Sequence, residues 1–154
     1  MIKILYIIFL SLIVANCSFK KVVEHHGVPF LEKKQTLLKV NETNTNDIKE
    51  ILGNPSTTSK FDNDIWIYIE NKSTKSSLIK LGKTKYIKNN VLVLEINNKG
   101  LLVKKKLYTI NDVNNIKYSE QTTQSTDKDT FVYGFLSSIK QKIDSPKKRR
   151  SKKR

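Results

Sequence analysis

The sequence is poor in the side chains that carry covalent, metal or phosphate chemistry. It has one cysteine, two histidines and five glycines. A single cysteine excludes an internal disulfide, and no glycine-rich phosphate loop, HExxH motif or Ser/His/Asp constellation can be placed in it. The acidic residues are dispersed and form no strand-end pair suited to acid–base catalysis. We therefore predict one compact domain that is not an enzyme and needs no cofactor.

Acidic residues are also scarce. There are 14 Asp and Glu against 29 Lys and Arg, which gives a formal net charge of +15. Residues 145–154 contain no core-forming side chain, so we predict a solvated, disordered tail there. Each cation near a lipid surface favours anionic headgroups by about 1 kcal/mol, so the tail is our candidate for binding anionic phospholipid. Its seven cations are Lys147, Lys148, Arg149, Arg150, Lys152, Lys153 and Arg154.

The chain lacks a hydrophobic run long enough to span a bilayer. Its most apolar stretch, 4–15, has 12 residues, whereas a spanning helix needs about 20. With Lys3 before it, this stretch predicts a signal peptide over 1–16. Cys17 follows in the sequence LIVANC, which resembles a bacterial lipobox, and Ser18 resembles the residue found in lipoproteins sent to the outer membrane. We predict that Cys17 carries the lipid anchor; the alternative is an ordinary signal peptide with an incidental cysteine.

Residues 17–26 show no helical or strand periodicity, so we predict a lipid-anchored tether there. His25 and His26 within it invite a metal hypothesis. The chain has no other histidine, and lipidation would consume Cys17, so a closed site lacks ligands. We interpret the two histidines as solvated tether residues and predict no metal site.

The stretch 44–68 specifies a helix followed by a strand. Asn44 is placed to cap a helix, with Asp47 completing a capping box, and Gly53 with the following Pro55 ends the helix. Its apolar stripe is Ile48, Ile51 and Leu52. A first short helix is predicted upstream, with Phe30, Leu31, Leu37 and Leu38 on one face. After position 64, Ile65, Ile67 and Ile69 alternate with Trp66 and Tyr68, and this period of two indicates a strand.

Further strands are predicted downstream, and together they give the fold class. We expect strands at 65–70, 91–96 and 101–108, a looser one at 58–61, and a tight turn over 97–100 in which Gly100 supplies a positive φ. The connection 71–90 either lengthens the hairpin or is mobile. The fold predicted for 27–110 is α+β, with two short helices packed on one face of a three-stranded antiparallel meander.

The C-terminal third divides into a polar linker, an amphipathic helix and the basic tail. Residues 111–129 are polar, so we predict a linker. In 130–144, Phe131, Phe135, Ile139 and Ile143 recur at steps of four, which predicts an amphipathic helix, although Gly134 weakens it. The helix either docks back on the domain or lies on a membrane or partner.

Several motifs in order resemble one family. The lipobox, I-x-x-I-L-G-x-P at 48–55, F-x-x-D-x-W-x-Y at 61–68 and L-x-L-x-I-N-N-K-G at 92–100 are similar to the SmpA/OmlA family. Its members are small outer-membrane lipoproteins that form the BamE component of the β-barrel assembly machinery. The resemblance implies a helix pair on a three-stranded antiparallel sheet facing the periplasm. It also implies a non-catalytic role that stabilises the complex of the barrel subunit and companion lipoproteins, with contact to anionic phospholipid.

The matching block supplies the candidate partner-binding residues. Phe61 and Asp62 lie in the turn before the strand, where they can face a partner. Trp66 and Tyr68 either pack in the core against the helices or are exposed as interface hot spots.

Two other functions remain as alternatives. A lipid-anchored periplasmic inhibitor, or another protein with a single target, would use the helix–helix–sheet unit that resembles β-lactamase inhibitor proteins. Nucleic-acid binding through the tail fits the charge but conflicts with export, so we expect no nucleic-acid partner.

Overall fold

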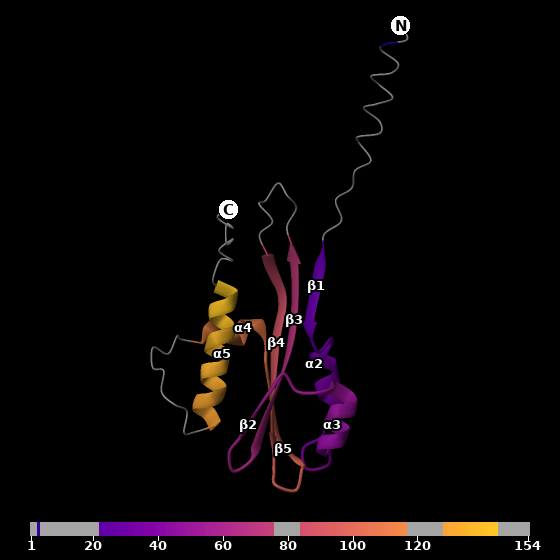
Figure 1. Cartoon of the computed structure of the whole chain (residues 1–154), viewed down its shortest axis with the longest axis vertical. Helices are drawn as coiled ribbons and strands as arrows, with labels where there is room; N and C mark the ends of the chain where they lie inside the picture. Colours follow the sequence, from indigo (N-terminus) through magenta and orange to yellow (C-terminus); the bar gives the residue numbers. More distant parts are fainter. Residues whose placement is uncertain (1–2, 4–21, 76–83, 117–127, 145–154) are drawn as a thin grey trace, which may run out of the picture.

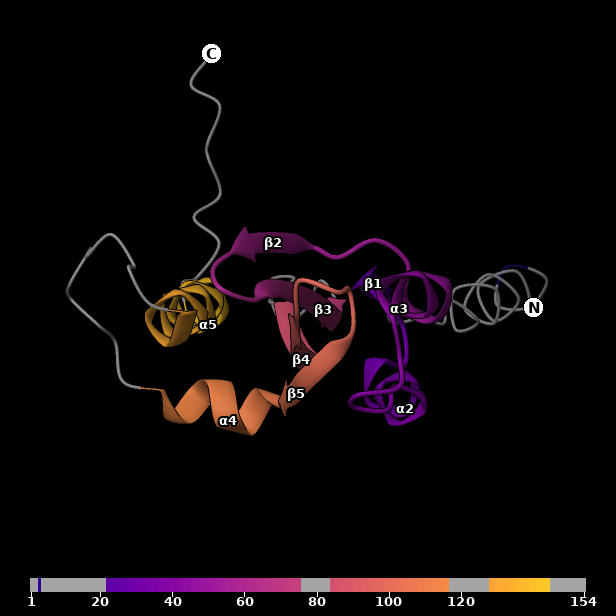
Figure 2. The same ribbon diagram turned by 90° about the horizontal axis from the view of Figure 1, so that it is seen from below.

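In the computed structural model, residues 3, 22–75, 84–116 and 128–144 are described. They form an antiparallel sheet that lies between a helix pair on one side and a longer helix on the other (Figures 1 and 2). The elements are β1 (Val23–Gly27), α2 (Leu31–Lys34), η1 (Gln35–Leu37), α3 (Thr45–Leu52), β2 (Thr57–Lys60), β3 (Asp64–Lys75), β4 (Thr84–Ile96), β5 (Leu102–Tyr108), α4 (Ile110–Asn115) and α5 (Lys128–Asp144). The α+β class predicted from the sequence is confirmed.

The helix predicted between the cap at Asn44 and the stop at Gly53 is confirmed as α3. The Asn44 side chain accepts hydrogen bonds from the backbone N–H groups of Asn46 and Asp47, at 2.8 and 3.1 Å, and Asp47 accepts from the Asn44 N–H at 3.0 Å. This reciprocal arrangement satisfies N–H groups that have no partner inside the helix. Gly53 ends the helix with φ 81° and ψ −162°, a region that is almost exclusive to glycine.

The sheet has five strands rather than the three of the predicted meander. β3, β4 and β5 form that meander, and β1 and β2 are added to it; β2 confirms the looser strand predicted at 58–61, whereas β1 was not predicted. Both additional strands pair with the edge of β3 that β4 leaves open: β2 pairs with 64–67 and β1 with 70–74. This edge has room for two strands because β3 and β4 extend to Lys75 and Thr84. The connection 71–90 thus lengthens the hairpin over its described part.

The predicted tether is wrong for its last residues, because Val23–Gly27 form β1. The strand has no apolar alternation to reveal it, and only Glu24 among its five residues is even half-buried. Backbone pairing with β3 therefore holds it in place. Gly27 is required at its end, since φ is +80° and an added Cβ would lie 2.0 Å from the Ile69 carbonyl oxygen.

The first helical segment differs from the single apolar face that we predicted. Leu31 and Leu38 are buried, but Phe30 and Leu37 are 64% and 63% exposed. The segment is one α-helical turn followed by a 3₁₀ turn, so residues seven apart do not form one continuous face. Phe30 precedes the helix with a left-handed φ of 59°, and its N–H donates to the buried Glu70 side chain at 3.1 Å.

The two faces of the sheet belong to different cores. On one face, Tyr68, Leu92 and Leu94 pack with the helix pair through Leu31, Leu38, Ile48 and Leu52. On the other face, Ile65, Ile67 and Val91 pack with Val113 of α4 and with Val132 and Leu136 of α5. Figure 2 shows the helix pair and α5 on opposite sides of the sheet.

The linker predicted over 111–129 is wrong at its start, because Ile110–Asn115 form α4. Thr109 and Asp112 build a second capping box, with 2.7 Å between the Thr109 N–H nitrogen and the Asp112 carboxylate. Val113 is the single fully buried residue of this turn, too weak a pattern to predict a helix. Residues 117–127 lie outside the described residues.

The amphipathic helix predicted over 130–144 is confirmed as α5, and of the two alternatives left open for it, the structure shows the helix docked on the domain. Val132 and Leu136 are buried against the sheet, and Phe131, Phe135, Ile139 and Ile143 pack around them. Gly134 is exposed, and a Cβ added there would meet no atom within 4 Å, so this glycine does not mark a close approach. None of the helices in the described part of the chain is long and apolar enough to cross a membrane.

We predict that Gly53→Val destabilises the domain by about 1–3 kcal/mol, because valine is strained at this positive φ. An added Cβ at Gly53 meets no atom within 4 Å, so the loss reports backbone strain alone. Urea unfolding measures it. Gly134→Ala, also free of contacts, is the matched control and is expected to stabilise by about 0.5–1 kcal/mol. An unchanged free energy of unfolding for Gly53→Val would show that the helix stop does not need glycine.

Candidate functional site

Tyr68 lies in the core and is not available to a partner, which corrects its place among the candidate contact residues. Its side chain is fully buried under the helix pair. The hydroxyl donates to the Gly53 carbonyl oxygen at 3.0 Å, and burial raises its pKa to about 12. Tyr68 therefore ties the middle of β3 to the end of α3 and stays protonated at physiological pH.

The other three candidate contact residues do not share one surface. Trp66 is half-buried on the helix-pair face, and the Lys49 Nζ lies 5.4 Å from its ring centroid. Phe61 packs on the opposite face, where its ring centroid is 5.9 Å from that of Phe131. Asp62 is exposed in the turn between β2 and β3. Within this block, Asp62 is the side chain most open to a partner.

The predicted lipid-binding residues lie outside the described part of the structure. Cys17 precedes the first described strand, and the cations of the tail follow the end of α5. The two histidines, by contrast, are exposed residues of β1. Within the described ranges, no group of three or more His, Cys, Asp and Glu side chains is arranged to hold a metal ion.

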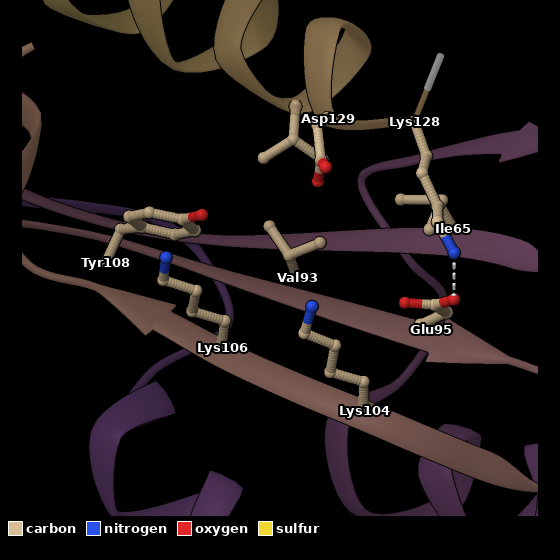
Figure 3. Close-up of a pocket in the computed structure, with 9 residues that line it drawn as sticks. Ile65, Val93, Glu95, Lys104, Lys106, Tyr108, Lys128 and Asp129 are labelled. Atoms are coloured by element: carbon tan, nitrogen blue, oxygen red, sulfur yellow. Dashed lines mark hydrogen bonds and ion pairs between the residues drawn. The ribbon is translucent and has the colours of Figure 1, made fainter.

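A small charged pocket that the sequence did not reveal lies where α5 begins (Figure 3). Its volume is about 80 Å³. Lys104 and Lys106 extend from β5 toward α5, and Asp129 faces them from the helix. The lining residues are Ile65, Val93, Glu95, Lys104, Lys106, Tyr108, Lys128, Asp129 and Val132.

Glu95 is the best-connected charged group in this pocket. Its carboxylate accepts from the Lys128 Nζ at 2.5 Å and from the Asn63 Nδ2 at 2.9 Å. The hydrogen bond from Lys128 is the largest cause that lowers the pKa of Glu95, and the same bond raises the pKa of Lys128. Because Asn63 and Lys128 come from different parts of the chain, Glu95 fixes the start of α5 over the β2–β3 turn.

The remaining cations of the pocket are less constrained. The Lys106 Nζ lies 4.8 Å from the Tyr108 ring centroid, a cation–π contact. Lys104 makes no ion pair with any residue in the described ranges. The arrangement suits weak binding of a polar group, and among the described residues it offers no nucleophile paired with a base. Lys104 pairs with Glu95 and Lys106 pairs with Val93 in the register of β4 and β5. The alternating lysines were visible in the sequence, but they do not indicate where α5 lies.

The described elements define a small α+β domain in which a helix pair covers one face of an antiparallel sheet. Residues 31–106 match the family model of the outer membrane protein assembly factor BamE domain. The domain that these residues form belongs to the BamE family, which confirms the resemblance drawn from the sequence motifs. The match runs from α2 into β5, and α4 and α5 follow it. No curated protein and no solved structure matches the chain significantly.

We predict that the Glu95–Lys128 pair makes the stability depend on acidic pH. The pKa of Glu95 is lower in the folded state than its ordinary value of 4.5, so its contribution is present above pH 4.5 and is lost as the pH falls through the folded pKa. The melting temperature of the wild type should therefore fall more steeply below pH 4.5 than that of Glu95→Gln. Glu50→Gln, at an exposed position of α3, is the control. Parallel curves for wild type and Glu95→Gln would contradict the role of Glu95.

Proposed function

We propose that this protein is a lipid-anchored, non-catalytic subunit of the complex that assembles β-barrel proteins into the outer membrane. The observation that carries the proposal is the BamE domain at 31–106. In this role the domain stabilises the complex through contacts with the barrel subunit and companion lipoproteins. The acidic residues are dispersed, and among the described residues the pocket offers no nucleophile paired with a base. Both observations support a binding role over a catalytic one.

The anchor in this proposal is Cys17, with the domain facing the periplasm. The supporting observation is the lipobox-like sequence LIVANC directly after an apolar stretch of 12 residues. Several acyl chains, each stabilised by about 0.8 kcal/mol per buried CH₂, hold a protein on a membrane without a spanning helix.

The basic tail is proposed to add an electrostatic contact with anionic phospholipid. Its seven cations within eight residues lie within a Debye length of a lipid surface if the tail reaches it. Binding to anionic vesicles that does not change when residues 147–154 are removed, at low and at high salt, would contradict this part of the proposal.

The proposed function is tested by affinity purification of the tagged full-length protein from solubilised membranes, followed by mass spectrometry. We expect recovery of an outer-membrane barrel protein with companion lipoproteins, because the BamE domain binds the complex. A Cys17→Ser control should recover less of the complex, since the unlipidated chain is not held at the same membrane. Recovery of one soluble periplasmic enzyme in place of the complex would contradict the assembly function and support the inhibitor alternative.

A further inference from the structure

One end of the molecule brings together three segments that are distant in the sequence. β1 begins there, β3 ends there and β4 begins there. Val23 pairs with Thr74, and Lys75 pairs with Thr84. We call residues 22–25, 72–75 and 84–88 the hairpin end. The C-terminal end of α5 points the same way (Figure 1). The N-terminal segment, which carries the proposed anchor, therefore joins the domain at the same end at which α5 finishes.

The hairpin end exposes apolar side chains. Val22, Val23 and Ile87 are 58%, 45% and 45% exposed. Ile87 is the extra residue of a β-bulge, because Lys72 pairs with Lys88 and Ser73 with Tyr86, which leaves position 87 without a partner in the register. A β-bulge changes the direction in which its extra side chain points. Here the extra residue is β-branched and apolar, and it belongs to neither core.

The same end is rich in lysine. Lys72, Lys75, Lys85 and Lys88 lie in it, and Glu24 is the one carboxylate of these three segments. Glu24 pairs with Lys75, and Glu32 of α2 approaches Lys88 at 3.6 Å. Lys72 and Lys85 make no ion pair with the residues that the structure describes. The net charge of the surface is therefore positive, and it surrounds exposed apolar groups.

We infer that the hairpin end lies against an anionic lipid bilayer and sets the orientation of the domain on the membrane. This inference rests on the proposed lipid anchor at Cys17. Val23, the first residue of β1, is six positions after Cys17, and a fully extended chain spans at most about 3.6 Å per residue, so the start of β1 lies within about 22 Å of the lipidated residue. Lysines around apolar side chains fit the headgroup region of an anionic bilayer.

This orientation places the other end of the sheet far from the lipid. β4 runs for 13 residues from the hairpin end to the β4–β5 turn, and a strand rises about 3.3 Å per residue, which gives roughly 40 Å. With β3 and β4 standing upright on the bilayer, the helix pair, the β4–β5 turn and the charged pocket at the start of α5 face the periplasm and its proteins.

The first test measures the depth of two labels in the lipidated full-length chain. The lipid consumes Cys17, so a cysteine introduced as Ile87→Cys is the single reactive thiol, and Asn98→Cys in the β4–β5 turn is the matched control. Each variant carries an environment-sensitive fluorophore and is reconstituted into phosphatidylglycerol–phosphatidylcholine vesicles with quencher-bearing lipids. We expect strong quenching at position 87 and none at position 98. Equal quenching at both positions, or none at position 87, would overturn the inference.

The second test does not depend on the anchor. The unlipidated Cys17→Ser chain is titrated with the same vesicles, and the double variant Lys72→Glu/Lys85→Glu is compared with Lys33→Glu/Lys99→Glu, which changes the charge equally at exposed sites elsewhere. The basic tail is intact in both. We expect the first pair to weaken binding by about tenfold or more and the second to have a smaller effect. Equal losses would overturn the hairpin end as the lipid contact.

The two tests separate this inference from the proposed function. Failure to recover the assembly complex leaves the vesicle results unaffected, so it contradicts only the assembly role. A label at position 87 that stays solvent-exposed on vesicles but is shielded in the purified complex would show that the hairpin end contacts protein, and would overturn the lipid contact alone.

Discussion

The alternation of side chains along β3 is the constraint on which the rest of the structure depends. Ile65 and Ile67 point to one face of the sheet, and Trp66 and Tyr68 point to the other. A strand that is apolar on both faces is stable in water only when both faces are covered. The helix pair covers the Tyr68 face and α5 covers the isoleucine face, so the chain beyond the matched BamE residues completes the domain.

The helices on each face of the sheet are held in place by polar contacts as well as by apolar packing. The Tyr68 hydroxyl joins β3 to the Gly53 carbonyl at the end of α3, and Lys105 donates to the carbonyls of Gln35 and Leu38, both at 2.7 Å. On the other face, Glu95 holds Lys128 at the start of α5. These bonds satisfy carbonyls at helix ends and a largely buried carboxylate, and they specify where each helix begins or ends against the sheet.

The sequence was most informative where local chemistry decides the structure. The capping box at Asn44, the glycine stop at Gly53 and the turn at Gly100 act within a few residues, and all three were predicted correctly. The segments that were missed depend on partners distant in sequence. β1 has no apolar pattern and exists because β3 extends beside it, and α4 has one buried residue, Val113. The burial of Tyr68 could not be predicted without knowing that helices cover both faces of the sheet.

The same limit applies to the candidate site. Residue types in one strand can indicate a cation-rich face, but the pocket at Glu95, Lys104 and Lys106 exists because α5 docks above it. The motifs of the sequence indicated the family, and the match of residues 31–106 to the BamE domain confirms it.

The docking of α5 is the central structural claim, and hydrogen–deuterium exchange of the intact protein tests it most directly. An isolated helix of this length, 17 residues, is marginal in water, so protection of its amides reports packing on the sheet. We predict that amides near Val132 and Leu136 exchange slowly, together with those of β3 and β4. Exchange of the α5 amides at the rate of an unstructured chain, with β3 and β4 still protected, would contradict it.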